Sequence, residues 1–119
     1  MDFINVKKQL LDFMKSDEEN KICIDCKNPS PLFVSINNAV FICEACSFKH
    51  QTLGSSVSYV KSINEPWDEY LLAYVLRGGN RKFSFAMYDY KIVDDVSDYL
   101  WKYKLKGIEN YRLIVNYFA

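Results

Sequence analysis

The sequence predicts a single α+β domain over residues 1–119, in which a small β-sheet is surrounded by about five helices. The chain has 119 residues, half of them hydrophobic, which suits one domain with one core. Its four cysteines form two Cys-x-x-Cys pairs, and short segments typical of strands lie between and after the pairs. The remaining segments mostly repeat apolar residues at helical spacing.

The first predicted helix covers residues 3–15. Phe3, Val6, Leu10 and Met14 recur at the spacing that gives a helix one buried face. Polar residues 16–20 then separate this helix from the cysteine module, which runs from residue 22 to about residue 54.

The cysteine module predicts one metal site. Cys23 and Cys26 form the first pair, and Cys43 and Cys46 form the second, sixteen residues later. Each Cys-x-x-Cys turn directs two sulfurs at one ion, and four thiolates in a tetrahedron select zinc or iron. We expect one structural zinc ion, because four protein ligands leave no open coordination position.

Iron, two disulfides and free thiols are the alternatives for these cysteines. Disulfides require an oxidising compartment, and the charged first sixteen residues lack the continuous apolar stretch of a secretory signal. A redox dithiol normally uses one Cys-x-x-Cys pair, not two.

The strands are predicted at residues 32–35 and 39–42, which form a hairpin around Asn37 and Asn38, and at residues 56–63. Residues 47–53 predict a helical turn that Gly54 closes, because glycine adopts the left-handed conformation found after helix ends.

Three further helices are predicted after the strands. The first starts near Pro66, ends before Gly78 and turns Trp67, Leu71 and Tyr74 inward. Asn80 caps the second, which reaches about residue 88. The third is capped at residue 94 or 95 and broken at residue 107. Residues 107–119 form a C-terminal extension, helix or strand, that packs on the domain or on a partner.

The composition excludes some functions. Fifteen basic and fifteen acidic residues give no net charge, which argues against a nucleic-acid partner. No apolar run reaches the eighteen residues of a membrane span. Lys102, Lys104 and Lys106 are expected on the solvated side of a helix.

Aromatic residues make up 16% of the chain, and most fall in its second half. Tyrosine, tryptophan and phenylalanine are enriched at the centres of protein interfaces. We therefore expect some of them to form a partner surface, which would include Trp101, Tyr103, Tyr111 and Phe118.

The cysteine module resembles the catalytic domain of Arf GTPase-activating proteins (ArfGAPs). The spacing Cys-x₂-Cys-x₁₆-Cys-x₂-Cys is that of the family, and the flanking segments agree with it. The similar segments include residues 20–26, 31–37, 40–43, 50–54 and 58–62, with later landmarks at Trp67 and at residues 79–80. The resemblance covers roughly residues 5–106 and implies the ArfGAP fold with its structural zinc.

One position departs from the family pattern in a way that bears on function. The family's His-Arg-x-Leu-Gly motif carries the arginine finger, and here that position is Gln51. An arginine finger places a fixed positive charge beside the phosphoryl transition state, and glutamine is neutral. Lys49, Arg77 and Arg81 are the candidate substitutes.

Three other residues of the module are expected to be structural. His50, the only histidine, is expected to be hydrogen-bonded beside the finger position, because four thiolates already close the metal site. Asp25 and Glu44 are expected to be solvated turn residues, because a site that already carries about two negative charges disfavours further anions.

From these observations, we expect a non-catalytic, zinc-dependent protein-interaction module. It would serve as a scaffold or as an accessory subunit of a larger assembly. The alternative is an active GTPase activator for Arf-type small GTPases, in which another cation replaces the finger. The absence of a clear presequence favours a cytoplasmic location, with an organelle as the alternative.

Overall fold

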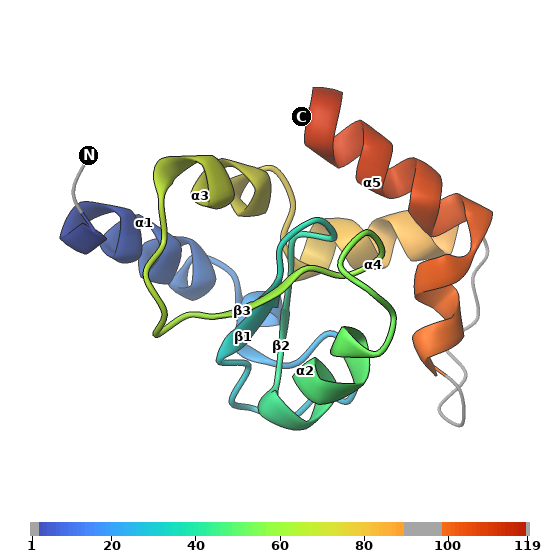
Figure 1. The fold of residues 1–119 in the computed structure, drawn as a ribbon, viewed down its shortest axis with the longest axis horizontal. Helices are drawn as coiled ribbons and strands as arrows, with labels where there is room; N and C mark the ends of the chain where they lie inside the picture. The colour runs from blue at the N-terminus through green and yellow to red at the C-terminus, as the bar shows by residue number, and fades with distance from the viewer. Residues whose placement is uncertain (1–2, 90–98, 119) are drawn as a thin grey trace.

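A computed structural model describes residues 3–89 and 99–118 and contains a three-stranded antiparallel sheet with helices around it (Figure 1). The strands are β1 (Phe33–Ser35), β2 (Val40–Ile42) and β3 (Val60–Ser62), in the order β2-β1-β3. Val34 lies opposite Phe41 in β2 and opposite Lys61 in β3. The expectation of an α+β domain with a small sheet is confirmed.

Five α-helices surround this sheet in the described part of the chain. They are α1 (Phe3–Lys15), α2 (Glu44–Gln51), α3 (Glu69–Leu76), α4 (Asn80–Asp89) and α5 (Lys106–Phe118). There are also two 3₁₀ segments: η1 (Glu18–Lys21) follows α1, and η2 (Tyr99–Lys104) precedes α5. None of these helices is long and apolar enough to cross a membrane.

The two faces of the sheet belong to different parts of the core. Successive side chains of a strand point to opposite faces, so Val40 and Ile42 lie on one face and Phe41 on the other. Phe41 packs with Val34 and with residues of α1 and α3, such as Leu10 and Leu72. Val40 and Ile42 instead pack with the cysteine module and with residues of α4, η2 and α5, which include Phe83, Tyr103, Ile108, Tyr111 and Val115.

Asn80 joins segments that are far apart in the sequence. Its Oδ1 accepts a hydrogen bond from the Phe41 amide at 2.7 Å, and its Nδ2 donates to the carbonyls of Glu19 and Ile22, each at 2.8 Å. Its own amide donates to Asn20 Oδ1 at 2.8 Å. Asn80, which the sequence predicted as a helix cap, therefore links α4 to β2 and to the segment that leads into the first cysteine pair, through buried hydrogen bonds.

The β1–β2 turn meets the end of α3 closely. Ala39 adopts φ 55°, a left-handed conformation, and its carbonyl accepts a hydrogen bond from Gly79 at 2.8 Å. A Cβ added to Gly78 would lie 2.4 Å from Ala39 Cβ. Only glycine fits at position 78 in this arrangement.

Several boundaries differ from the sequence predictions. The helix expected from residue 66 begins at Glu69, because Asp68 accepts a hydrogen bond from the Leu71 amide at 2.9 Å and acts as the N-cap. Tyr74, expected to face inward, is 38% exposed. Gly107 does not break a helix and instead lies in the first turn of α5. The helix cap expected at residue 94 or 95 lies outside the described residues.

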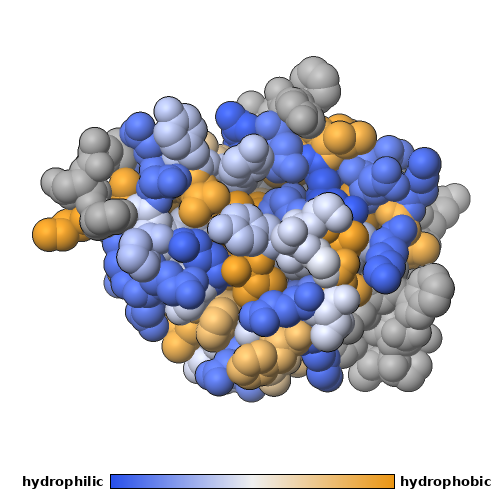
Figure 2. Space-filling model, viewed as in Figure 1, coloured by the Kyte–Doolittle hydropathy of each residue, from blue (hydrophilic) through white to orange (hydrophobic). Residues whose placement is uncertain are grey.

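On the face shown in Figure 2, surface hydrophobic side chains are scattered. Figure 2 shows them interspersed with hydrophilic side chains on the face in view, without one continuous apolar area. The exposed aromatic residues of the described chain are Phe48, Tyr59, Tyr70, Tyr74, Phe85 and Tyr88.

The expected partner surface needs correction at two residues. Tyr103 and Tyr111 are buried in the core, so their rings are not available to a partner in this structure. Both rings pack on Phe83, Tyr103 with its ring stacked and Tyr111 edge-on. The side chains of Trp101 and Phe118 lie outside the described part of the structure.

Candidate metal centre and the surface of helix α2

The four cysteine sulfurs form one compact group. All four lie within 4.8 Å of one another, and Cys26 Sγ is 3.5 Å from Cys43 Sγ. A disulfide would hold its sulfurs about 2.05 Å apart, so this distance is not that of a covalent bond. Tetrahedral zinc with Zn–S bonds of about 2.3 Å separates its sulfurs by about 3.8 Å. The group therefore fits one zinc ion.

Local backbone structure positions each cysteine pair. In the first pair the Cys23 amide donates to Asn28 O at 2.8 Å, and Lys27 adopts φ 67° and donates its amide to Cys23 O at 3.0 Å. This tight turn brings Cys26 back beside Cys23. The second pair lies at the start of α2, where Cys43 is the N-cap and Cys46 follows three residues later on the same helix face.

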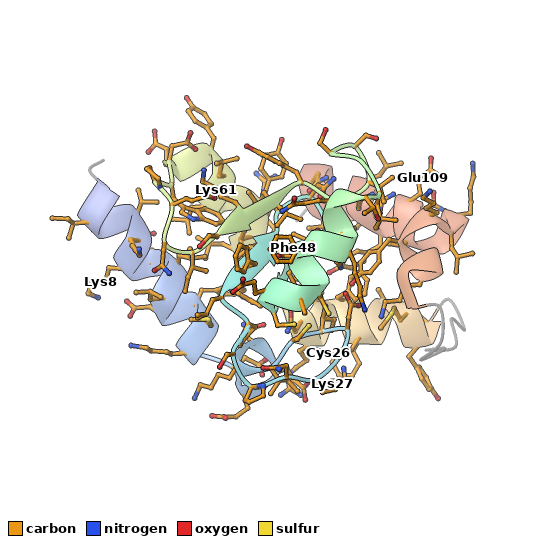
Figure 3. The ribbon with its side chains drawn as sticks, turned by 60° about the horizontal axis from the view of Figure 1, so that its bottom comes forward. Lys8, Cys26, Lys27, Phe48, Lys61 and Glu109 are labelled. Atoms are coloured by element: carbon orange, nitrogen blue, oxygen red, sulfur yellow. The ribbon has the colours of Figure 1, made fainter. Side chains whose placement is uncertain are left out.

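Three of the four cysteines of the metal centre are buried. Cys23, Cys43 and Cys46 are buried, whereas Cys26 is exposed. Figure 3 shows the sulfur atoms beside α2, with Cys26 and Lys27 toward the outside. The hydrogen bond with Cys46 lowers the pKa of Cys23 to about 5, although burial opposes this shift. A thiol with such a pKa is deprotonated at neutral pH, which is the form that binds metal.

Asp25, between the two cysteines of the first pair, does not face solvent as expected. Its side chain is fully buried and accepts hydrogen bonds from His50 Nε2 at 2.7 Å and Tyr103 Oη at 2.7 Å. The ammonium of Lys102, itself buried, lies 2.9 Å from Asp25 Oδ1. The expectation that Asp25 is a solvated turn residue is wrong, and so is the expectation that Lys102 lies on a solvated helix side. Glu44 is exposed.

The partners of Asp25 stabilise the charged form of its carboxyl group. Burial alone would raise the pKa of this carboxyl, but the hydrogen bond from His50 and the charge of Lys102 outweigh burial and leave its pKa below the ordinary value. The pKa of Tyr103 lies well above its ordinary value, because burial and the neighbouring Asp25 carboxylate both disfavour a phenolate. A buried ion pair with added hydrogen bonds is the arrangement that makes a charge tolerable in a protein interior.

His50 connects Asp25 to a chain of buried polar groups. Its Nδ1 lies 2.7 Å from Ser58 Oγ, which lies 2.7 Å from Ser35 Oγ. Asn38 Nδ2 donates to Ser35 Oγ at 2.8 Å, and Arg112 donates to Asn38 Oδ1 at 3.0 Å. This buried polar network, from Asp25 to Arg112, joins the metal centre to β1, α2 and α5. The expected structural role of His50 is confirmed by these contacts.

Gln51, the residue at the finger position, is the last residue of α2 and is exposed. Its place is fixed from both sides, because His50 before it is buried and Gly54 after it closes the turn with φ 89°. Phe48, one helical turn earlier, is 60% exposed and faces outward from α2 (Figure 3). The last turn of α2 thus exposes the neutral amide of Gln51 and the ring of Phe48, with Lys49 between them in the sequence.

The three arginines of the chain are all engaged elsewhere. Arg81 makes two hydrogen bonds to the Asp17 carboxylate, at 2.7 and 2.9 Å. Arg77 donates to Asn116 O at 2.6 Å, and Arg112 belongs to the buried polar network. Lys49 is exposed on α2.

Comparison with known proteins identifies the family. The family model described as a putative GTPase-activating protein for Arf matches residues 7–106. This chain belongs to the Arf GTPase-activating protein family. The four cysteines are accordingly the ligands of the single zinc ion of an ArfGAP zinc finger.

Among its relatives, ADP-ribosylation factor GTPase-activating protein 3 from Bos taurus is 30% identical over 113 residues, which cover 93% of this chain and 21% of the relative. The probable ADP-ribosylation factor GTPase-activating protein AGD15 from Arabidopsis thaliana is 33% identical over 81 residues, which cover 66% of this chain and 35% of the relative. The chain therefore spans between a fifth and about a third of the length of these relatives.

The fold has known counterparts. The crystal structure of a putative GTPase-activating protein for ADP ribosylation factor from Cryptosporidium parvum aligns with a TM-score of 0.79 and 25% identity, covering 92% of this chain and 90% of that one. The solution structure of the ArfGap domain of human RIP aligns with a TM-score of 0.62 over 93% of this chain, at 21% identity. The second likeness concerns the fold alone.

Proposed function

We propose that this ArfGAP domain is a non-catalytic, zinc-dependent protein-interaction module, which acts as a scaffold or accessory subunit of a larger assembly. The observation that carries the proposal is the exposed, neutral Gln51 at the end of α2. The chain keeps the ArfGAP fold and the zinc ligands, and buried hydrogen bonds of His50 hold the end of α2 in place. What it lacks is the positive charge of the arginine that the family resemblance implies at position 51.

The size of the missing contribution supports an inactive domain. An arginine finger accelerates GTP hydrolysis by about 10³–10⁵, or roughly 4–7 kcal/mol of barrier. A glutamine amide donates hydrogen bonds but carries no charge to oppose the one that develops on the phosphoryl oxygens. Arg81 and Arg77 are held by Asp17 and Asn116, so replacing the finger with either would first break these contacts.

The second candidate is an active GTPase activator that uses Lys49. This residue is exposed on α2, two positions before Gln51. Lysine carries the required charge, but it lacks the planar fork with which arginine contacts two phosphoryl oxygens at once.

A single-turnover measurement of GTP hydrolysis by an Arf-type GTPase separates the two candidates. We expect the wild-type domain to change the intrinsic rate by less than about tenfold, because no finger charge is present. Gln51→Arg should raise the rate well above that of the wild type, and Gln51→Ala serves as the matched control. Zinc content and the unfolding midpoint are measured for each variant.

A wild-type stimulation of 10³-fold would overturn the proposal, because a stimulation of that size is within the range of a working finger. If Lys49→Ala then abolished the stimulation, the second candidate would replace the first.

A further inference from the structure

Cys26 differs from the other three zinc ligands in its exposure. Cys23, Cys43 and Cys46 are at most 5% exposed, whereas Cys26 is exposed. Figure 3 shows it beside Lys27, toward the outside of the molecule. A small reagent dissolved in water can therefore reach one of the four sulfurs while the fold stays closed.

An exposed zinc ligand is open to oxidation. A cysteine that binds zinc is a thiolate, which is the nucleophilic form of the side chain. Accessible thiolates are the cysteines that peroxides oxidise first, and the first product is a sulfenic acid. A second thiolate close to the sulfenic acid converts it into a disulfide.

Cys43 is placed to supply that second thiolate. Its Sγ lies 3.5 Å from Cys26 Sγ, so the two sulfurs need to approach by roughly 1.5 Å to reach the length of a disulfide. Cys43 is the N-cap of α2, and its carbonyl accepts a hydrogen bond from the Ser47 amide at 2.9 Å. The helix therefore holds Cys43, and the movement falls to Cys26 on its exposed turn.

We propose that Cys26 is an oxidation site for peroxides and that Cys43 converts the product into a Cys26–Cys43 disulfide, with release of zinc. An electron pair of Cys26 Sγ forms a bond to one peroxide oxygen, the O–O bond breaks, and the other oxygen leaves as hydroxide. The Cys43 thiolate then attacks the sulfenic sulfur, so that the S–S bond forms, the S–O bond breaks and a second hydroxide leaves. The two thiolates lose two electrons, and one hydrogen peroxide gains them and becomes two hydroxides, which solvent protons convert to water.

The disulfide removes two of the four zinc ligands. Cys23 and Cys46 remain, and two thiolates are fewer than the four ligands of a structural zinc site. Because the free energy of zinc binding is part of the free energy of folding, loss of the ion destabilises the domain. A dithiol reductant restores both thiolates by exchange, so the change is reversible. This site is separate from Gln51 and does not depend on the proposed lack of catalysis.

The experiment treats the zinc-loaded full chain with hydrogen peroxide and follows the released zinc with a chromophoric indicator. The remaining thiols are then blocked in denaturant, and the chain is digested with trypsin. Trypsin cuts after Lys21, Lys27 and Lys49, which places the first cysteine pair on residues 22–27 and the second on residues 28–49. A disulfide between the pairs joins these two peptides, and a disulfide within a pair leaves them separate.

We expect the joined peptides to accumulate in step with the released zinc. Fragmentation of the joined species in the mass spectrometer should place the bond between Cys26 and Cys43. Dimedone, which reacts with sulfenic acids and not with thiols, should label Cys26 alone when it is present during the oxidation. Dithiothreitol with added zinc should restore the zinc content.

A variant tests the exposed ligand separately. Three cysteines and one histidine also form a structural zinc site, so Cys26→His keeps four ligands and loses the accessible thiolate. Peroxide should release zinc from this variant at least about tenfold more slowly, because the remaining thiolates are at most 5% exposed. Cys23→His is the matched control, because it replaces a buried ligand in the same way and keeps Cys26 and Cys43. It should release zinc about as fast as the wild type.

Four outcomes would overturn the proposal. They are a disulfide within either cysteine pair, a disulfide between two copies of the chain, a sulfinic acid at Cys26 without a disulfide, and equal rates of zinc release from Cys26→His and Cys23→His. The peptide map uses the unaltered chain, so it decides the matter even if a variant fails to bind zinc.

Discussion

The substitution Asp25→Asn would test the buried ion pair beside the zinc ligands. The wild-type carboxylate has no exposed surface and accepts hydrogen bonds from His50 and Tyr103, with the Lys102 ammonium 2.9 Å away. Asparagine preserves the volume of the side chain and one acceptor oxygen. It removes the negative charge that lies 2.9 Å from the Lys102 ammonium, whose side chain is 3% exposed.

Two estimates of the cost overlap at about 3 kcal/mol. Removing one partner of a buried ion pair destabilises a protein by about 3–5 kcal/mol. Counted by contacts, an amide oxygen at the Oδ1 position keeps the contacts with Tyr103 and Lys102 and loses the hydrogen bond from His50 to Oδ2, and a hydrogen bond to a charged group contributes about 1.5–3 kcal/mol. A domain of this length has a free energy of unfolding of roughly 6–18 kcal/mol, so the loss should be large but need not abolish folding.

The assay is urea unfolding followed by tryptophan fluorescence, with zinc at the same saturating concentration throughout. With a denaturant slope of about 1.5 kcal/mol per molar, a loss of 3–5 kcal/mol lowers the unfolding midpoint by about 2–3 M. Asp12→Asn is the matched control, because it breaks the exposed ion pair between Lys8 and Asp12. Such surface pairs contribute at most about 1 kcal/mol.

A second substitution checks the cause. Adding Lys102→Met to Asp25→Asn removes the second charge of this buried ion pair and should recover part of the lost stability, because replacing both members of a buried pair is far less costly than removing one. The reasoning fails if Asp25→Asn shifts the midpoint no more than Asp12→Asn does, or if the double variant is no more stable than the single one. Zinc content, measured in parallel, separates loss of the metal from loss of the ion pair.

Three further predictions follow from other parts of the structure. Removing zinc with a chelator, or the substitution Cys43→Ser, should unfold the domain as followed by circular dichroism, because structural zinc contributes on the order of 10 kcal/mol; a chelated protein with an unchanged spectrum would contradict this. Gly78→Ala should destabilise the domain by about 1–3 kcal/mol in urea unfolding, since the new methyl group would lie 2.4 Å from Ala39 Cβ, and Ala39→Gly should rescue part of the loss. The hydrogen bond from Arg81 lowers the pKa of Asp17 to about 2, so this contact stabilises the fold above about pH 4 and is lost as the pH falls through 2. A carboxyl titration by NMR that gave Asp17 the same pKa in the wild type and in Arg81→Ala would exclude this cause.

The sequence alone was sufficient to predict the features that depend on the spacing of nearby residues. The first helix was predicted at residues 3–15 and is observed at Phe3–Lys15, because its apolar residues repeat every three or four positions. The cysteine spacing likewise predicted the metal ligands, since each pair is formed by one short turn. The exposed position of Gln51 follows from its place at the end of a short helix.

The buried charges were not predictable in the same way. Asp25 and Tyr103 are 78 positions apart, and no local pattern shows that their side chains meet. An aspartate inside a cysteine turn and a lysine among other lysines both have the ordinary appearance of solvated residues. The one local indication was the lone His50, because a buried histidine requires partners for both ring nitrogens.

Gly107 shows a second limit of predicting structure from local sequence. A glycine inside a helix costs about 1 kcal/mol relative to alanine, so the sequence predicted a break there. The structure instead places Gly107 in the first turn of α5, where Ile108, Tyr111 and Val115 enter the core one after another along one face. Burial of these three side chains outweighs the local preference of the glycine.

The bridge made by Asn80 has a consequence for the order of events during synthesis. The cysteine ligands end at Cys46, but the amide that ties the segment before the first pair to β2 arrives 34 residues later. At about 5–20 residues per second, the ribosome takes about 2–7 s to add those residues. Through that interval the cysteines are complete while the Phe41 amide and the carbonyls of Glu19 and Ile22 lack their final partner. A nascent chain thus carries all four zinc ligands for seconds before the residue that closes the fold around them has been made.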